Sequence, residues 1–146
     1  MTEELFEQIK LDLTKHEGCK TDVYLCSEGI PTVGIGHALL GDEELPVGTT
    51  VSMEQVLDWF KEDCEEALSD ARALFLNFDS LPDQVKRVLV NMAFNLGRSR
   101  LGKFKNLIRA VNEGNWVKAA DEMIDSRWYN QVGNRSVELE NWMRNV

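Results

Sequence analysis

Most of the chain shows apolar residues at the spacing of an amphipathic helix. The first such segment runs from about residue 2 to residue 16 and ends near Gly18. A longer one begins at the capping-box sequence Ser52-Met53-Glu54-Gln55 and keeps a single apolar stripe to Leu74. Four shorter helices are predicted in the second half of the chain, over residues 82–96, 104–112, 116–124 and 137–144.

Residues 23–35 break this helical pattern and favour strands. Val23-Tyr24-Leu25 and Thr32-Val33-Gly34-Ile35 are short β-favouring pieces, and the residues between them have the composition of a turn. They predict a hairpin or a small sheet. The fold class is therefore α+β and mostly helical.

The order of these elements predicts one domain with two lobes over residues 1–146. We expect a small β-containing lobe over about residues 16–55. The long helix joins it to a helical lobe over about residues 75–146, to which the first helix also belongs.

Composition places the chain among ordinary globular domains, with 43% hydrophobic and 28% charged residues. No apolar run approaches the ~20 residues that cross a bilayer, and the acidic N-terminal segment lacks the basic leader of a signal peptide. The three cysteines, Cys19, Cys26 and Cys64, are an odd number, which favours reduced thiols. Their spacing matches no zinc motif.

The formal net charge of −9 is distributed unevenly along the chain, with −13 on residues 1–79 and +4 on residues 80–146. Five cations gather in the basic half, and they could meet an anionic polymer or form a solvated helix face: Arg98, Arg100, Lys103, Lys105 and Arg109. We expect no nucleic-acid partner, because the total charge repels phosphate and no groove-reading motif is present.

Glu17 is a candidate acid catalyst because of its place at the end of the first predicted helix. The negative end of the helix dipole disfavours an ionised carboxylate there. Cleavage of a glycosidic bond requires a carboxyl group that stays protonated until it donates to the leaving oxygen. On these grounds alone Glu17 is one of many glutamates in the chain.

Three separate blocks of sequence strengthen this interpretation: Glu17-Gly18 with Tyr24, Glu28-Gly29 and Thr32–His37; Asn91–Gly97; and Ser126–Gln131 with Asn134-Arg135. In this order they resemble the phage-type lysozymes of glycoside hydrolase family 24, the muramidases that include the T-even lysozymes and their endolysin relatives. The resemblance covers nearly the whole chain and implies a lysozyme-like fold. It also implies an endolysin-type glycoside hydrolase that lyses cells by cutting the β-1,4 bond between N-acetylmuramic acid and N-acetylglucosamine in bacterial peptidoglycan.

The catalytic pattern of that family is a glutamate, eight residues, an aspartate or occasionally a cysteine, five residues and a threonine. Here it falls on Glu17, Cys26 and Thr32. The resemblance makes Glu17 the general acid, Cys26 the second functional group and Thr32 the residue that holds the attacking water. It implies no metal or organic cofactor. The neighbouring Glu17 carboxylate is expected to raise the pKa of the Cys26 thiol, so the thiol should act poorly as a fixed negative charge. Two roles then remain, activation of water or direct attack on the sugar, and we favour activation of water.

The resemblance also places six residues around a substrate cleft, either as contacts or as scaffold: Glu28, Gly36, Phe94, Asn95, Phe104 and Arg127. For Glu28 and Arg127, the alternative to a substrate contact is an ion pair between the two side chains. His37 is expected to form a partly buried ion pair with Asp63, which would raise the pKa of the imidazole. Large aromatics usually serve burial first, so we expect most of the four tryptophans to be packing residues.

Two other functions remain open. The missing carboxylate at Cys26 allows a peptidoglycan-binding or scaffold domain with weak or no turnover. Cys26 with His37 allows a thiol hydrolase that cuts peptide stems. For the lysozyme, the resemblance implies a monomer that is made in a host cytoplasm, inserts into no membrane, and reaches the wall or periplasm with the help of a separate holin-like protein.

Overall fold

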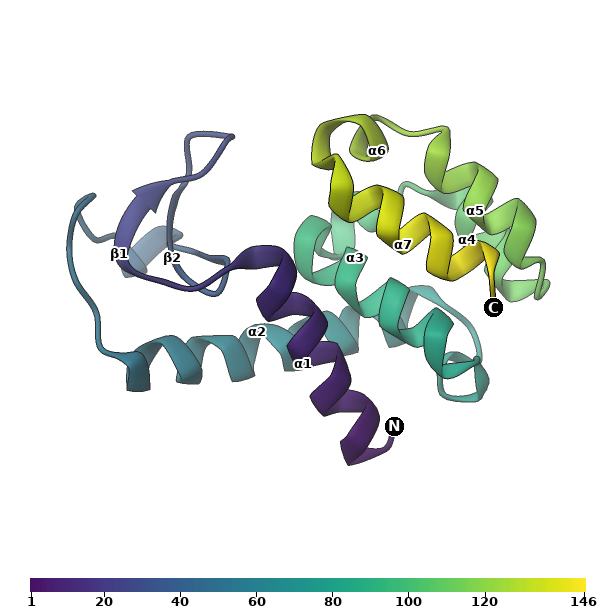
Figure 1. The fold of residues 1–146 in the computed structure, drawn as a ribbon, viewed down its shortest axis with the longest axis horizontal. Coiled ribbons are helices and arrows are strands. Elements are labelled where there is room, and N and C mark those ends of the chain that lie inside the picture. Colours follow the sequence, from purple (N-terminus) through teal and green to yellow (C-terminus); the bar gives the residue numbers. More distant parts are fainter. The chain divides into compact units, whose positions relative to one another are not determined.

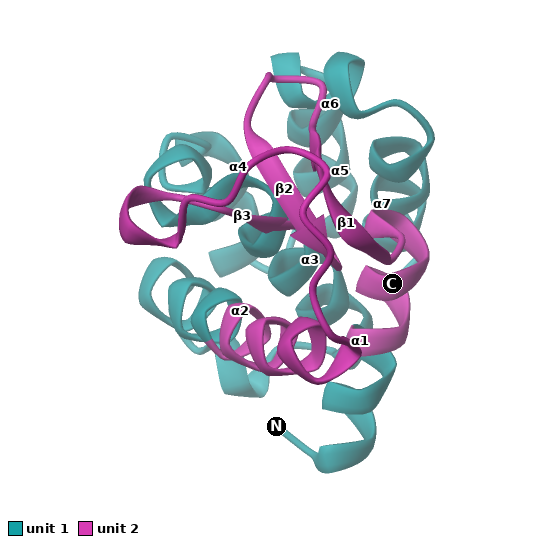
Figure 2. Ribbon diagram, turned by 90° about the vertical axis from the view of Figure 1, so that its left-hand side faces the viewer, with its two compact units in different colours: residues 1–9, 66–146 teal, residues 10–65 magenta.

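The computed structural model describes all residues 1–146 and contains two compact units, which Figure 2 distinguishes by colour. The helical unit comprises residues 1–9 and 66–146, and the β-containing unit comprises residues 10–65. Seven α-helices and three strands confirm the predicted α+β, mostly helical class. That the two units form a single domain stays a prediction. No helix has both the length and the apolar character needed to cross a bilayer.

The boundaries between the units fall inside two helices, α1 (Glu3–Glu17) and α2 (Met53–Leu74). In α1, the predicted apolar positions Leu5, Ile9 and Leu13 are all buried. The predicted start of α2 is confirmed, because the Gln55 N–H donates to Ser52 Oγ at 3.1 Å and satisfies one amide of the first turn.

The β-containing unit holds an antiparallel sheet of β1 (Lys20–Leu25), β2 (Pro31–Gly34) and β3 (His37–Ala38), in that order. Tyr24 lies opposite Thr32, and Val33 lies opposite His37. Val23 and Val33 pack with Leu39 in a small core, closed by the half-buried Leu45, Val51 and Trp59. Because successive strand residues point to opposite faces, Tyr24 and Thr32 lie on the face away from that core.

The helical unit continues with five helices: α3 (Asp83–Leu101), α4 (Lys105–Asn112), α5 (Trp116–Ile124), α6 (Arg127–Val132) and α7 (Asn134–Arg144). Helix α7 packs against α3, α5 and α6, while α5 also packs against α4 (Figure 1). Leu89, Met92, Met123, Leu139 and Met143 are fully buried among them. Burial of such large apolar side chains is the main source of stability in this unit.

The structure departs from the predicted helices in three places, the simplest being that α7 begins at Asn134, three residues before its predicted start. Gly97, the expected end of α3, does leave helical geometry with φ +78°, but a further helical turn follows to the buried Leu101. Helix α6 was not predicted at all. The N–H of Tyr129 donates to Ser126 Oγ at 3.2 Å and caps its start, and Gly133 with φ +73° ends it.

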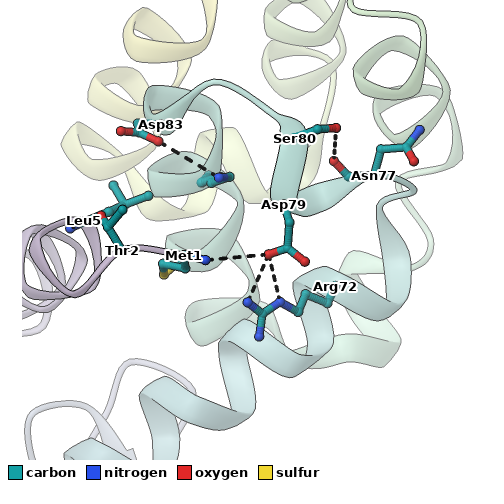
Figure 3. Close-up of polar contacts among 9 residues, drawn as sticks. Met1, Thr2, Leu5, Arg72, Asn77, Asp79, Ser80 and Asp83 are labelled. Carbon is teal, nitrogen blue, oxygen red and sulfur yellow. Dashed lines mark hydrogen bonds and ion pairs between the residues drawn. The ribbon is translucent and has the colours of Figure 1, made fainter.

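A polar cluster fixes the start of α1 within the helical unit (Figure 3). Asp79 Oδ1 accepts hydrogen bonds from Arg72 Nε at 3.2 Å and Nη2 at 3.0 Å, and the Met1 amino group lies 4.0 Å away. The hydrogen bond from Arg72 lowers the pKa of Asp79. The Leu5 N–H donates to Thr2 Oγ1 at 3.1 Å and caps the helix.

Candidate active site

Glu17 is the last residue of α1, and its side chain is half-buried. The Gly18 N–H donates to the Thr14 carbonyl at 2.9 Å, and the φ of +72° at Gly18 turns the chain out of the helix. The carboxyl group of Glu17 comes to lie against Gly36, after β2: a Cβ built on Gly36 would be 2.5 Å from Glu17 Oε1. The structure therefore brings the predicted acid to the small sheet.

Cys26 and Thr32 flank the turn between β1 and β2. The Cys26 N–H donates to the Ile30 carbonyl at 3.0 Å, and the Gly29 N–H donates to the Cys26 carbonyl at 2.9 Å. Thr32 Oγ1 donates to the Ile30 carbonyl at 2.8 Å and is also within hydrogen-bonding reach of the Cys26 thiol. The two predicted residues are therefore direct neighbours.

The pKa of the Cys26 thiol is lowered, so the expectation that it is raised was wrong. Burial does raise it, but hydrogen bonds from the backbone of Ile30 and Glu28 and from the Thr32 hydroxyl outweigh burial. The only charge that raises it further is that of Glu28. A thiolate at this position is held by donors that the turn supplies.

Tyr24 links the two ends of the predicted catalytic pattern. Its pKa is raised by burial and then by the negative charges of Glu17 and Cys26, so its ring lies within electrostatic reach of both groups. Lys20 Nζ lies 4.4 Å from the centre of the same ring. An acid, a polarised thiol and a hydroxyl are thus gathered around one tyrosine inside the β-containing unit.

The predicted ion pair between His37 and Asp63 is confirmed, with Nδ1 2.7 Å from Asp63 Oδ2. A second carboxylate, Glu43, lies 2.9 Å from Nε2, and Trp59 stacks on the imidazole with ring centres 4.6 Å apart. Burial lowers the pKa of His37, but the two carboxylates prevail and raise it. With both ring nitrogens engaged, His37 has none left to activate Cys26 as a thiol hydrolase requires.

The helical unit contains a hollow of about 550 Å³ that Phe104 and Arg127 line. Trp128 forms part of its wall, with Nε1 donating to Asn95 Oδ1 at 2.8 Å. The edge of Phe104 meets Trp128 with ring centres 6.4 Å apart. Three of the predicted substrate-binding residues, Asn95, Phe104 and Arg127, therefore gather around Trp128. Phe94, a fourth, is half-buried on α3 outside this lining.

The basic cluster contributes Arg100, Lys103 and Lys105 to the wall of the same hollow. Sequence reasoning identified the cluster but did not connect it with Arg127 or with any cavity. Their shared location depends on the corner between α3 and α4, which follows the deviation at Gly97. In neither unit do three His, Cys, Asp or Glu side chains form a group able to hold a metal ion.

A family model described as phage lysozyme matches residues 14–143, which include every predicted site residue. The chain belongs to the phage lysozyme family. Among its relatives is the peptidoglycan hydrolase gp36 of Pseudomonas phage phiKMV, 30% identical over 86% of this lysozyme. This lysozyme spans only 14% of that protein's length.

Two other relatives are matched over most of their own length. A probable T4-type lysozyme 2 of Dictyostelium discoideum is 27% identical over 93% of this lysozyme and 91% of the relative. The endolysin of Salmonella phage P22 is 30% identical over 77% of this lysozyme and 75% of the relative. Three blocks of sequence predicted membership of this family, and the comparisons confirm it.

Proposed function

We propose that this phage lysozyme hydrolyses bacterial peptidoglycan at the β-1,4 bond between N-acetylmuramic acid and N-acetylglucosamine. The observation that carries the proposal is the placement of three residues in one small unit: the Glu17 carboxyl group lies against Gly36, and Cys26 and Thr32 both donate to the Ile30 carbonyl. Family membership and the names of the relatives, a peptidoglycan hydrolase and an endolysin among them, support the same substrate.

In this mechanism the Glu17 carboxyl donates its proton to the glycosidic oxygen as the bond from that oxygen to the anomeric carbon breaks. A water molecule attacks the anomeric carbon and gives its proton to the Cys26 sulfur. Thr32 holds that water. Because the hydrogen bonds of the turn and of Thr32 lower the pKa of Cys26, a larger fraction of the thiol is in the thiolate form that accepts this proton. Attack by water inverts the anomeric configuration.

The Thr32 hydroxyl has one proton for two acceptors, the Ile30 carbonyl and the Cys26 sulfur. It serves the carbonyl when the thiol is protonated and turns to the sulfur when the thiolate forms. This exchange stabilises the base without a permanent neighbouring cation.

We further propose that the hollow in the helical unit binds part of the same polymer. Phe104, half-buried against the buried Trp128, offers apolar ring surface to a sugar, and the exposed Arg127 offers a guanidinium to carboxylates of the peptide stems. In the β-containing unit, Glu28 is exposed at the turn beside Cys26, and its contact with substrate stays a prediction.

The decisive test of the acid is Glu17→Gln, which keeps the shape of the side chain but cannot donate the proton. Loss of turbidity of purified cell wall and release of reducing ends are measured for both proteins. We expect the rate to fall by at least about 100-fold, equivalent to about 3 kcal/mol in barrier, with an unchanged melting temperature. A variant that keeps a third of the rate would remove Glu17 from this role.

The role of Cys26 is tested by a graded set. Cys26→Asp is expected to keep substantial activity, whereas Cys26→Ala loses most of it because no base remains. NMR of the freshly released anomer separates activation of water, which inverts, from direct attack by sulfur, which retains. Full activity in Cys26→Ala would show that Cys26 is a packing residue without a role in the reaction.

A cysteine where the family pattern favours a carboxylate supports one second candidate, a domain that binds peptidoglycan with little turnover. Sedimentation with insoluble wall without release of products would favour it. Mass spectrometry of the digested wall shows which bond is cut, by which reaction, and whether the protein is active.

The proposed activity places the enzyme at the cell wall after synthesis in a host cytoplasm, with passage dependent on a separate holin-like protein. Cells that express the chain are then expected to lyse only once their membrane is permeabilised, for example by chloroform. Gel filtration tests the expected monomer.

A further inference from the structure

Gly36 occupies a position in the β-containing unit where the first atom of a side chain would meet the carboxyl end of Glu17. A Cβ built on its backbone lies 2.5 Å from Glu17 Oε1, 2.7 Å from Cδ and 3.0 Å from Cγ. Ordinary van der Waals contacts of such an atom begin at about 3.4 Å. The carboxyl end of Glu17 therefore fills the space that the first side-chain atom of any other residue would take.

We infer that Gly36 is a positioning residue for Glu17, whose missing side chain provides the place where the catalytic carboxyl group rests. The inference rests on the proposed function, because a displaced carboxyl group matters for catalysis only if it donates the proton. The sequence resemblance placed Gly36 at the substrate cleft. The inference gives it a different role, which is to position the carboxyl group of Glu17.

The backbone conformation of Gly36 does not by itself distinguish this position from other glycines of the unit. Its φ of +66° favours glycine, but Gly41 has φ +60° in the same unit and its Cβ would meet nothing within 4 Å. A Cβ on Gly34, with φ +69°, would approach the buried Val56 Cγ1 at 3.1 Å, so there a methyl group of the core would have to move. The contact with a carboxyl group is specific to Gly36.

Gly36→Ala and Gly41→Ala form a matched pair for the test. Both introduce an alanine at a similar positive φ, so both bear the same backbone strain, but only the first drives Glu17 from its position. A general acid must lie within about 2.6–3.2 Å of the oxygen that it protonates, and an error of about 1 Å in placement costs on the order of 100-fold in rate. We expect kcat for wall lysis to fall by about that factor in Gly36→Ala, with KM changed less than threefold, and both constants to remain near wild type in Gly41→Ala.

Thermal unfolding tests the contact independently of catalysis. In the otherwise wild-type protein, Gly36→Ala is expected to lower Tm more than Gly41→Ala does. In a Glu17→Ala background the obstructing Cγ, Cδ and Oε atoms are gone, so the two substitutions should lower Tm equally. This coupling is expected whether or not Glu17 is the acid, whereas Glu17→Gln alone decides the proposed function.

Two results would overturn the inference: a kcat for Gly36→Ala within threefold of wild type, or an equal loss of Tm from Gly36→Ala with and without the Glu17 side chain. If Gly36→Ala fails to fold, the double variant with Glu17→Ala decides. Recovery of folding there supports the steric conflict, and continued failure refutes it.

Discussion

Replacing Asp63 by asparagine is expected to destabilise the protein most at acidic pH and least at alkaline pH. Both nitrogens of His37 face carboxylates, Asp63 at 2.7 Å and Glu43 at 2.9 Å. An imidazolium donates to both, whereas neutral imidazole has a single N–H and must turn a lone pair toward one of them. Protonation of His37 is therefore what makes this cluster attractive.

The sign of the pH dependence follows from the raised pKa of His37. A histidine whose pKa is higher in the folded state contributes all of its stabilisation below the unfolded pKa of about 6.5. That contribution is lost as pH rises through the folded pKa. The window in which stability changes thus lies above about pH 6.5.

Exposure sets the size of the effect. The side chains of His37 and Asp63 are 10% and 23% exposed, so their charged hydrogen bond is expected to contribute about 2 kcal/mol at pH 5. Glu43 is 42% exposed and screened by solvent, which limits its share to below about 1 kcal/mol. For a chain of this length about 1 kcal/mol corresponds to about 3 °C, so Asp63→Asn should lower Tm by about 6 °C and Glu43→Gln by about 2 °C.

Circular-dichroism melts from pH 5 to pH 9 measure these differences, with Glu62→Gln as an exposed control on the same helix. The gap in Tm between wild type and Asp63→Asn should narrow as pH rises. NMR titration of a His16→Gln variant isolates the His37 signal, since the chain has two histidines. A constant gap across the range, or a His37 pKa at or below about 6.5, would refute the reasoning.

Three further outcomes are expected, two for variants and one for the unmodified protein. Trp128→Phe should lower the free energy of unfolding by about 1–2 kcal/mol in urea melts, because Asn95 Oδ1 loses the indole N–H that donates to it at 2.8 Å. Leu139→Ala should lower the free energy of unfolding by about 2–5 kcal/mol, because Leu139 is fully buried. Val137 on the same helix is 41% exposed, so Val137→Ala should change that free energy by no more than about 0.5 kcal/mol. Burial raises the pKa of Cys64 to about 12, so mass spectrometry should find it unalkylated by iodoacetamide until the protein is unfolded.

Periodicity was sufficient to predict the helices whose burial repeats over two or more turns. Helix α5 has the predicted bounds, Trp116–Ile124, because the residues buried along it, such as Ala119, Ala120 and Met123, recur at three- and four-residue spacing. Helix α6 has six residues, of which only Trp128 is buried, so it offers no period to detect. Its one local sign was Ser126, whose hydroxyl caps the first turn.

The place of Glu17 was predictable because the end of a helix depends on nearby residues. The neighbours of its carboxyl group were not, since Gly36 reaches it only through the turns and pairing of the sheet. The pKa of Cys26 was predicted with the wrong sign for a related reason. Charges can be read from the sequence, but backbone donors such as those of Ile30 and Glu28 exist only once the turn has closed.

The alternation of β1 and β2 connects the stability of the β-containing unit with its chemistry. Pairing of Tyr24 with Thr32 puts Tyr24 and the proposed water-holding Thr32 on one face while Val23 and Val33 enter the core on the other. A slip of one residue would exchange these faces, so the core selects the register that the proposed mechanism requires. His37 pairs with Val33 and is tied to α2 through Asp63, so the ion pair helps to hold that register. The contacts of His37 are with Asp63, Glu43 and Trp59, so loss of the ion pair should lower activity only as the folded fraction falls.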